Sequence, residues 1–472
     1  MRHSYKTLKD GDVLGHGGTE APSRRKLWKR SIVAVLAVVA FVLLLYVAAP
    51  PANDDRHHAI EKEGDRLLFV AVLHRHGART GLHHFTFENF TWPWKFGALT
   101  PEGMRMGFEM GQKLRTDYWP HLSSGSSKLD INVTSTDYPR TIDTVHSLLV
   151  GLFLEGGNEA DVVQGNCSCR PEFGGKAAPV DCIGKCLGLD SVPTHLPPVK
   201  VLNASNIEAS LLRQHDVCKE YQTWKLEWNK SEEYKTALKD FSKQIDFVKQ
   251  VVDDERLCAD DPANETMGGN ASTWCDNITL YGVEMVWDSA VCALAEGMDY
   301  PSPTNHTDLI NRLQPTVEFL QHHLYNVQQG PYVGGILLND ILVRMKAAEG
   351  TASVLLKSQN RKMGTITSAQ GASMAIYSAH DSTVSSLLAA LGMKNWTLPY
   401  FIAHITMELW AADSLNVSGP RVVLKYNDGR EDHVLDIEGC SNGECSFKSL
   451  LNATADRRST MADCTFVEDT EP

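Results

Sequence analysis

Residues 67–80 read LLFVAVLHRHGART, and this segment is the strongest indication of the fold in the sequence. Seven apolar residues, Leu67–Leu73, run without a break, which is typical of a strand buried on both faces of a parallel sheet. In open α/β sheets, ligands bind at the carboxyl ends of such strands, where His76 would arrive between Arg75 and Arg79. Flanking cations disfavour a metal but suit a phosphate dianion, because arginine presents a planar fork that matches phosphate oxygens. The alternative is a polar turn with solvated arginines.

Two later segments place further polar side chains at the same kind of junction. Residues 129–135 alternate as a strand does, and Arg140 follows at the start of the next expected helix. Residues 374–379 form a second buried apolar strand, which ends in His380 and Asp381. Because the carboxyl ends of parallel strands meet at one edge of a sheet, all three junctions can meet there. The structural alternatives are a surface arginine at a helix start and a capping aspartate beside a structural histidine.

These residue types suit phosphoryl transfer, which needs an in-line nucleophile, cations on the phosphate oxygens and a proton for the leaving group. A neutral His76 would attack phosphorus, and Asp381 would protonate the leaving alcohol. The phosphate charge would be offset by Arg75, Arg79, Arg140 and His380. A free aspartate has a pKa of about 3.9, so a proton-donating Asp381 predicts an acidic pH optimum. No metal or other cofactor is required, because side chains already supply the cations.

The N-terminal region predicts a membrane anchor. The 472-residue chain has a net charge of −13, although residues 1–30 hold eight Lys/Arg against three Asp/Glu. The strongly acidic remainder argues against nucleic acid as a partner. Within residues 31–50, Ile32–Ala49 is almost wholly aliphatic, and a helix of this length rises roughly 27 Å, enough to cross a hydrocarbon core. The positive-inside rule then makes residues 1–30 a cytosolic tail of a single-pass type II protein. A signal peptide cleaved after Val47-Ala48-Ala49 is the alternative.

The residues after the anchor are typical of a lumenal or extracellular domain. All eleven cysteines follow residue 50, as expected in an oxidising compartment. We expect glycans on the sequons at Asn89, Asn166, Asn203, Asn229, Asn264, Asn270, Asn277, Asn305, Asn395, Asn416 and Asn452. Asn132 also has a sequon, but it lies within an expected strand, so we expect it to be unoccupied. In the tail, Tyr5–Leu8 resembles the sorting signal that clathrin adaptors read, which would direct the protein to endosomes and lysosomes.

The sequence after the anchor divides into a stalk, a core and an insert. We expect residues 51–65 to be a polar stalk, and residues 66–153 and 331–472 to form an α/β core with a mostly parallel sheet. Residues 154–330 contain a Cys-rich loop and then helical stripes, which predict a mainly helical cap inserted into the core. An aromatic loop at residues 81–94 would either pack over the sheet or form a wall of the substrate pocket.

Three segments together resemble the histidine acid phosphatase family, of the lysosomal and prostatic type. They are Arg75–Arg79 (RHGAR), Ser135–Asp137 with Arg140, and Tyr377–Asp381 (YSAHD). The resemblance implies a phosphoglycerate mutase-like fold, a phosphohistidine on His76 and proton donation by Asp381. It also implies phosphate binding by the three arginines and His380, and relatives indicate a homodimer.

Two positions depart from the family pattern. Gly81 stands where a proline is usual, and Ala403 stands where a cysteine is expected, which leaves Cys292 without its usual partner. Zinc binding by the Cys-rich loop is less favoured than disulfides in an oxidising compartment. The expected bridges are Cys218–Cys464 and Cys440–Cys445, by resemblance and proximity, and in addition Cys258–Cys275 and two bridges among Cys167, Cys169, Cys182 and Cys186.

The sequence therefore predicts a membrane-anchored, metal-independent acid phosphatase that acts on small phosphate esters in endosomes or lysosomes, with the cell surface or Golgi as alternatives. A phosphatase of the same superfamily with narrower specificity, such as a phytase or a lysophosphatidate phosphatase, is the main functional alternative. A surface receptor with an inactive phosphatase fold is disfavoured, because pseudoenzymes usually lose catalytic side chains and all six are present.

Overall fold

The computed structural model describes residues 66–83, 85, 88, 90–123, 129–154, 167, 176–251, 278–298, 306–359, 372–411, 419–435 and 437–466. The expected tail, anchor and stalk (residues 1–65) lie outside these ranges, and so does the sorting motif at Tyr5–Leu8. Among the described residues, no helix is both long enough and apolar enough to cross a membrane.

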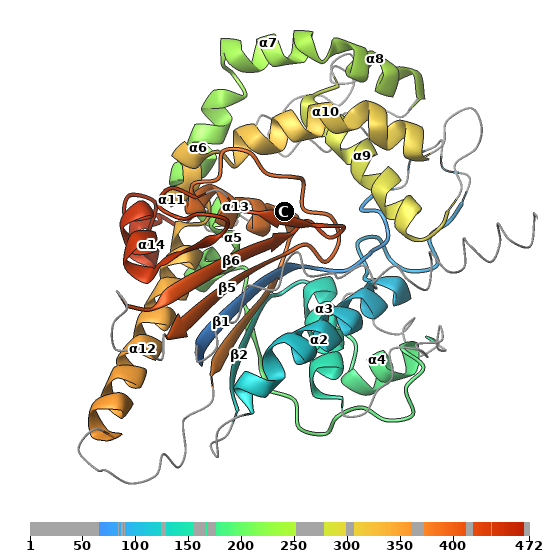
Figure 1. Cartoon of the computed structure of the whole chain (residues 1–472). Helices are drawn as coiled ribbons and strands as arrows, with labels where there is room; N and C mark the ends of the chain where they lie inside the picture. The colour runs from blue at the N-terminus through green and yellow to red at the C-terminus, as the bar shows by residue number, and fades with distance from the viewer. Residues whose placement is uncertain are drawn as a thin grey trace, which may run out of the picture. The chain divides into compact units, whose positions relative to one another are not determined.

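A mixed sheet lies at the centre of the described structure (Figure 1). Its strands run in the order β3-β2-β4-β1-β5-β6-β7, and β8 pairs with β6. The strands are β1 (Arg66–Arg75), β2 (Asp130–Thr136), β3 (Val199–Leu202), β4 (Ser373–Ala379), β5 (His404–Ala411), β6 (Arg421–Asn427), β7 (Asp432–Val434) and β8 (Glu444–Ser446). The first four of these pair in parallel, whereas β5 to β8 join the sheet by antiparallel pairing.

The expectation of a mostly parallel sheet is therefore wrong for half of these strands. Helices lie between β1, β2 and β4 along the chain, and parallel pairing requires such long crossovers. From β5 to β8 the described residues contain no helix, and only residues 428–431 separate β6 from β7. Short connections of this kind allow antiparallel neighbours. The parallel half of the sheet is the half that carries the predicted junctions.

Strand β1 lies in the middle of the sheet, between β4 and β5. Every residue from Leu67 to Arg75 is buried, which confirms the prediction of a strand covered on both faces. Strand β4 is buried in the same way from Met374 to Ala379. Apolar runs of this kind gain stability from both layers of helices that flank the sheet.

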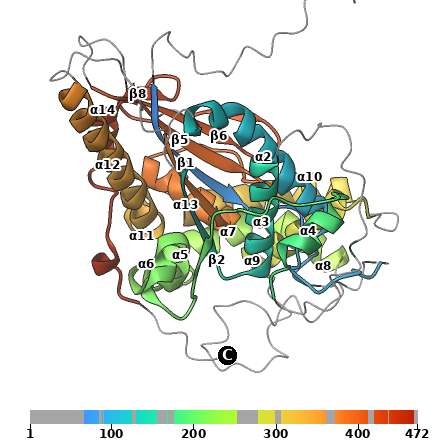
Figure 2. The ribbon, with the colours of Figure 1, turned by 90° about the horizontal axis from the view of Figure 1, so that it is seen from below.

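Helices cover both faces of the sheet, as the two views in Figures 1 and 2 show. Helices α2 and α3 pack together on one face, so closely that a Cβ on Gly111 would lie 2.0 Å from the Leu148 carbonyl oxygen. Helices α12 and α13 lie on the other face, against β1. The helices of the core are α2 (Pro101–Leu122), α3 (Pro139–Phe153), α4 (Val180–Cys186), α5 (Ser210–Val217), α11 (Gly330–Val333), α12 (Gly335–Gln359), α13 (Asp381–Leu391) and α14 (Phe447–Ala453).

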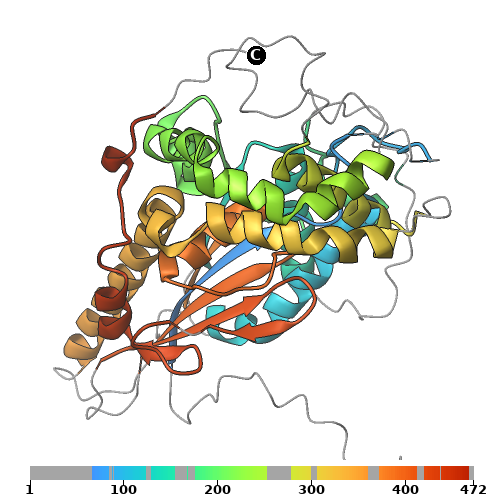
Figure 3. The ribbon, with the colours of Figure 1, turned by 90° about the horizontal axis from the view of Figure 1, so that it is seen from above.

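A second group of helices lies above the carboxyl ends of the parallel strands, in green and yellow in Figure 3. They are α6 (Lys219–Trp228), α7 (Glu232–Asp240), α8 (Ser242–Val251), α9 (Leu280–Ala295) and α10 (His306–Leu324). Within the expected helical cap, α7 and α8 follow each other directly and are separated by Phe241 alone. Residues 199–202, within the expected insert, form β3 and pair with β2. The domain boundaries themselves stay predictions.

The cysteines pair as follows within the described residues. The bridges are Cys218–Cys464, Cys440–Cys445 and Cys167–Cys186, and Cys182 is also disulfide-bonded. The first two are the pairs that the family resemblance implied, and the third lies within the expected group of four. Cys292 is a buried free thiol. Cys169, Cys258 and Cys275 lie outside the described residues.

Four of the expected glycosylation sites fall in the described residues. Asn203, Asn395 and Asn452 are exposed, and Asn229 is half-buried where its Oδ1 accepts a hydrogen bond from the Tyr281 hydroxyl. The other seven lie outside the described ranges. Asn132 lies on β2, with its side chain exposed, so its expected lack of a glycan stays a prediction.

Candidate active site

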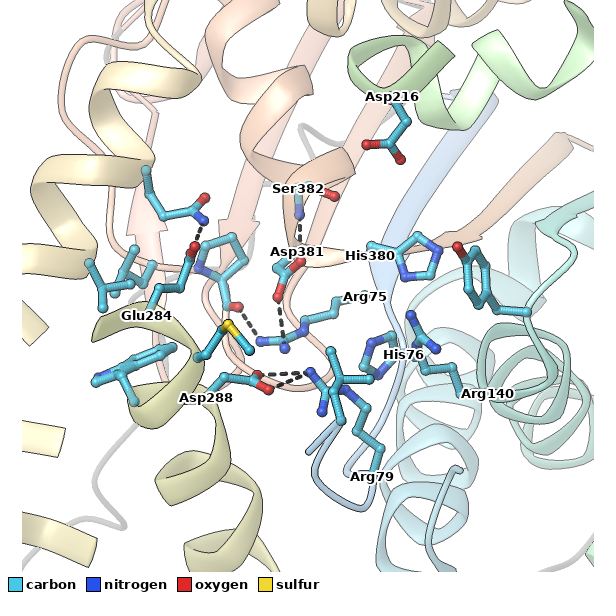
Figure 4. Close-up of a pocket in the computed structure, with 18 of the residues that line it drawn as sticks. Arg75, His76, Arg79, Arg140, Asp216, Glu284, Asp288, His380, Asp381 and Ser382 are labelled. Carbon is cyan, nitrogen blue, oxygen red and sulfur yellow. Dashed lines mark hydrogen bonds and ion pairs between the residues drawn. The ribbon is translucent and has the colours of Figure 1, made fainter. Parts of the chain in front are cut away.

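Three neighbouring parallel strands, β2, β4 and β1, end at the same edge of the sheet. His76 follows β1, and His380 and Asp381 follow β4 at the start of α13. Arg140 is the second residue of α3, which follows β2. The side chains that the sequence singled out line one cavity of about 330 Å³ at this edge (Figure 4). They are Arg75, His76, Arg79, Arg140, His380 and Asp381.

The His76 imidazole is buried and held in one orientation. Its Nδ1 lies 2.9 Å from the carbonyl oxygen of Gly77, which can only accept, so Nδ1 carries the proton. Burial, followed by the charges of Arg140 and Arg75, holds the pKa of His76 well below its usual value. The ring is therefore neutral, and Nε2 keeps its lone pair for an electrophile in the cavity.

The loop that carries His76 is fixed to the strands and helices around it. The His76 amide donates to the Ala379 carbonyl oxygen of β4 at 3.0 Å, and the Gly77 amide donates to the Thr144 hydroxyl of α3 at 3.1 Å. Gly77 also lies against the first turn of α2, where an added Cβ would be 2.2 Å from the Gly103 carbonyl oxygen. These contacts set the direction in which the imidazole points.

Three of the arginines, Arg75, Arg79 and Arg140, each keep a donor that no described residue accepts. Arg75 is almost fully buried; its Nη1 donates to the Pro399 carbonyl oxygen at 2.7 Å, and its Nη2 pairs with Asp381 at 2.8 Å. Arg140 stacks over the Tyr138 ring and has no carboxylate partner in the described chain. Burial and the charge of Arg79 lower the pKa of Arg140 to about 10. The Nε atoms of Arg75, Arg79 and Arg140 are buried without an acceptor among the described residues, an arrangement that suits an anion.

Arg79 is held by a helix of the second group. Its Nη2 donates to both carboxylate oxygens of Asp288 on α9, at 2.8 and 2.9 Å, and its Nη1 approaches the Cys292 sulfur at 3.2 Å. Burial opposes the charge of Arg79, but the Asp288 carboxylate outweighs it and raises the pKa of this guanidinium. Asp288 is not among the residues that the sequence motifs singled out. The available signal was a pair of carboxylates four residues apart, Glu284 and Asp288, in an otherwise apolar helix.

Asp381 faces the cavity, with 40% of its side chain exposed, and Arg75 lies against it. Burial raises the pKa of this carboxyl, but the charges of Arg75 and Arg79 together with the Ser382 amide bring it below the usual value. The carboxylate is thus ionised before an anion binds. A bound phosphate dianion would offset the arginine charges and raise that pKa.

His380 closes the side of the cavity next to α3. Its Nε2 lies 3.1 Å from the Thr136 hydroxyl at the end of β2, and its ring contacts those of His76 and Tyr138. Burial, followed by the charges of Arg140 and Arg213, holds the pKa of His380 well below its usual value. A neutral imidazole has one N–H to donate and one nitrogen to accept, so His380 can hydrogen-bond a phosphate oxygen.

The aromatic loop contributes to both of its expected roles. Leu82 and His83 line the cavity, whereas Phe85 is part of the core and Trp92 packs partly buried against it.

Away from the cavity, Asp428, Glu431 and His433 bring three ligand atoms together near β7. Asp428 already accepts hydrogen bonds from two backbone amides and from His433, so this group is explained as a turn.

The chain resembles known proteins in sequence and in fold. The family model of the histidine phosphatase superfamily (branch 2) matches residues 66–427. The chain is 27% identical to lysosomal acid phosphatase of Homo sapiens, over 82% of this chain and 77% of that protein. It is 26% identical to prostatic acid phosphatase of Bos taurus, over 84% and 86%. The crystal structure of a phytase from Klebsiella sp ASR1 has a TM-score of 0.53 at 14% identity, over 86% of this chain and 100% of that one, a likeness of fold alone. The chain belongs to the histidine phosphatase superfamily, branch 2.

Proposed function

We propose that the protein is a metal-independent acid phosphatase that hydrolyses phosphate monoesters through a phosphohistidine on His76. The observation that carries the proposal is the neutral His76 ring, whose Nε2 faces a cavity lined by three buried arginines. A nucleophilic nitrogen beside fixed cations is what transfer of a phosphoryl group requires.

In the first step, the phosphate of the ester lies among Arg75, Arg79 and Arg140, with His380 donating to one of its oxygens. His76 Nε2 attacks phosphorus in line, and the bond from phosphorus to the ester oxygen breaks. Asp381 gives its proton to that oxygen, so the product leaves as a neutral alcohol. The enzyme then holds a phosphoryl group on His76 and a carboxylate at Asp381.

In the second step, water attacks the phosphoryl group from the side that the alcohol has left. The Asp381 carboxylate takes a proton from that water, and the bond between phosphorus and Nε2 breaks. Inorganic phosphate leaves, and His76 returns to its neutral form with Asp381 protonated. The Gly77 carbonyl oxygen stabilises the imidazole throughout, because it accepts from Nδ1 at 2.9 Å.

The proposed function includes an acidic pH optimum. Before substrate binds, the Arg75 charge favours the ionised form of Asp381. A phosphate dianion between the arginines cancels that effect and favours the protonated acid. Catalysis therefore requires Asp381 to be protonated in the enzyme–substrate complex, and the protonated fraction is larger at low pH than at neutral pH.

We also propose that residues 31–50 anchor the protein in an endosomal or lysosomal membrane, with the catalytic domain on the lumenal side. The uncharged run in the sequence, the disulfides and the lysosomal name of a relative support this location. The homodimer and the adaptor contact at Tyr5–Leu8 stay predictions.

The test is hydrolysis of p-nitrophenyl phosphate by the purified ectodomain between pH 4 and pH 8. We expect the highest kcat near pH 5, and a loss of roughly 10⁴-fold or more in the His76→Ala variant, since no other nucleophile replaces the ring. His433→Ala, which changes a histidine on β7 outside the cavity, should behave as wild type. A His76→Ala variant as active as wild type would contradict the proposal.

A further inference from the structure

Most charged side chains of the cavity are joined in carboxylate–guanidinium pairs. The pairs are Arg75 with Asp381 at 2.8 Å, Arg79 with Asp288 at 2.8 Å, and Arg213 with Asp216 at 2.9 Å. Among the described lining residues, Arg140 is the arginine without a carboxylate partner. Because pairing cancels most of the positive charge, a single phosphate group suffices to neutralise what remains.

The remaining carboxyl of the cavity, Glu284, lies on the side where the leaving group must emerge. In-line attack places the leaving group opposite the attacking nitrogen of His76. In the view of Figure 4, Asp381 lies between His76 and Glu284, whereas Arg140 lies on the His76 side. The wall that α9 and α10 form beside Glu284 presents three apolar side chains, Met285, Trp287 and Val317. Its other polar members are Gln321, which binds Glu284, and Asp288, which pairs with Arg79.

Glu284 has no ion-pair partner among the described residues. The Gln321 side chain on α10 donates to its Oε1, and burial raises its pKa to about 7. The charged and titratable groups that face it from the elements packed around it are Asp288, Asp381, Lys225, Tyr221, Tyr281 and Tyr325. Two of these are carboxylates that repel its charge, and His83 lies in the same cavity lining.

We propose that Glu284 is a specificity residue that selects phosphate monoesters of neutral alcohols and rejects esters whose leaving group carries a second anion. The inference deepens the proposed function and rests on it. A second anion in the leaving group meets these apolar side chains and the Glu284 carboxyl, with the unpaired guanidinium of Arg140 on the far side of the cavity. It follows that an inositol polyphosphate is a poor substrate, which separates this enzyme from a phytase.

The test uses two esters that differ only in charge, 4-carbamoylphenyl phosphate and 4-carboxyphenyl phosphate. The measured quantity is the preference, which is kcat/KM for the amide divided by kcat/KM for the carboxylate, at pH 5.5 and pH 7.5. We expect the wild-type preference to favour the amide at both values and to grow roughly tenfold at pH 7.5, where Glu284 is ionised. The benzoate group is charged at both values, so the substrate does not cause this growth.

Glu284→Gln should keep the same preference at both pH values, because the amide cannot ionise. Glu318→Gln is the matched control, since Glu318 pairs with Gln314 along α10 outside the cavity. In this variant the preference should increase at pH 7.5 as much as it does in the wild-type protein. The inference about Glu284 would be overturned if the wild-type preference did not change with pH, or if the preference still increased at pH 7.5 in Glu284→Gln. Either result would leave the proposed function standing. Failure of the wild-type protein to hydrolyse either ester at any pH would overturn the proposed function and this inference with it.

Discussion

At the scale of single residues, the site places the neutral imidazole of His76 beside three arginines. His76 stays unprotonated because burial and three arginines penalise an imidazolium, while the Gly77 carbonyl oxygen fixes the tautomer. Asp381 experiences the opposite effect, because the same arginines favour its ionised form until a phosphate cancels them. In the proposed mechanism, one set of cations therefore keeps the His76 nucleophile neutral and makes protonation of Asp381 depend on bound substrate.

The role of Asp381 can be tested through the leaving group. Asp381→Asn should lower kcat for glycerol phosphate by roughly 10²- to 10⁴-fold, because an alkoxide leaves poorly without a proton. The loss should be much smaller for p-nitrophenyl phosphate, whose phenolate leaves unaided. Steady-state kinetics on both substrates measure the difference. Equal losses for the two substrates would indicate that Asp381 supports the structure rather than the proton transfer.

At the scale of elements, the contact between the His76 loop and α2 fixes the direction of the His76 side chain. Gly77 lies so close to Gly103 that a Cβ on either residue would reach backbone atoms at 2.2 Å or less. Thr100 closes the same junction, since its hydroxyl donates to the Ala78 carbonyl oxygen and accepts from the Gly103 amide. The start of α2 and the loop that carries His76 are therefore built as one unit.

Substitution of Gly77 tests this contact. We expect Gly77→Ala to lower the free energy of unfolding by roughly 2–3 kcal/mol, because backbone must move to admit the methyl group. Activity should fall more than stability accounts for, since the displaced loop carries His76. Gly350→Ala is a suitable control, because no atom lies within 4 Å of its added Cβ. Denaturant unfolding and kcat on the same preparations measure both effects, and a fully active Gly77→Ala would contradict this account.

The three strand-to-helix junctions could be predicted from the sequence because their signals are local. An unbroken apolar run such as Leu67–Leu73 marks a buried strand without knowledge of its neighbours. The antiparallel half of the sheet could not be predicted in this way, because pairing of β5 with β1 joins segments far apart in the chain. Asp288 and Glu284 were missed for the same reason: their role depends on how α9 lies over the sheet, which no local pattern encodes.

At the scale of the whole molecule, many buried histidines make stability depend on pH. Burial lowers the pKa of His74 from 6.5 to about 4, and it lowers those of His76 and His380 well below 6.5. Between these values and pH 6.5 the unfolded chain binds protons that the folded chain does not, so stability falls as the pH falls. Glu284 acts in the opposite direction, because its raised pKa favours the folded state at low pH.

The contribution of His74 can be separated from the others. Its shift corresponds to roughly 2 kcal/mol of stability lost between pH 7 and pH 5. Between pH 7 and pH 5, the free energy of unfolding of the wild-type protein should therefore fall by roughly 2 kcal/mol more than that of the His74→Gln variant. Urea unfolding of both proteins at the two pH values measures the difference. Parallel losses in the two proteins would show that His74 is not buried in its neutral form.

The central claim, that His76 carries the phosphoryl group, is tested most directly by trapping the intermediate. The ectodomain is mixed with a ³²P-labelled phosphate monoester near pH 5 and quenched in alkaline denaturant, which preserves phosphohistidine. We predict an acid-labile label on the peptide that contains His76, and no label in the His76→Ala variant. Rapid hydrolysis with no label on the protein, or a label on any other residue, would contradict the account.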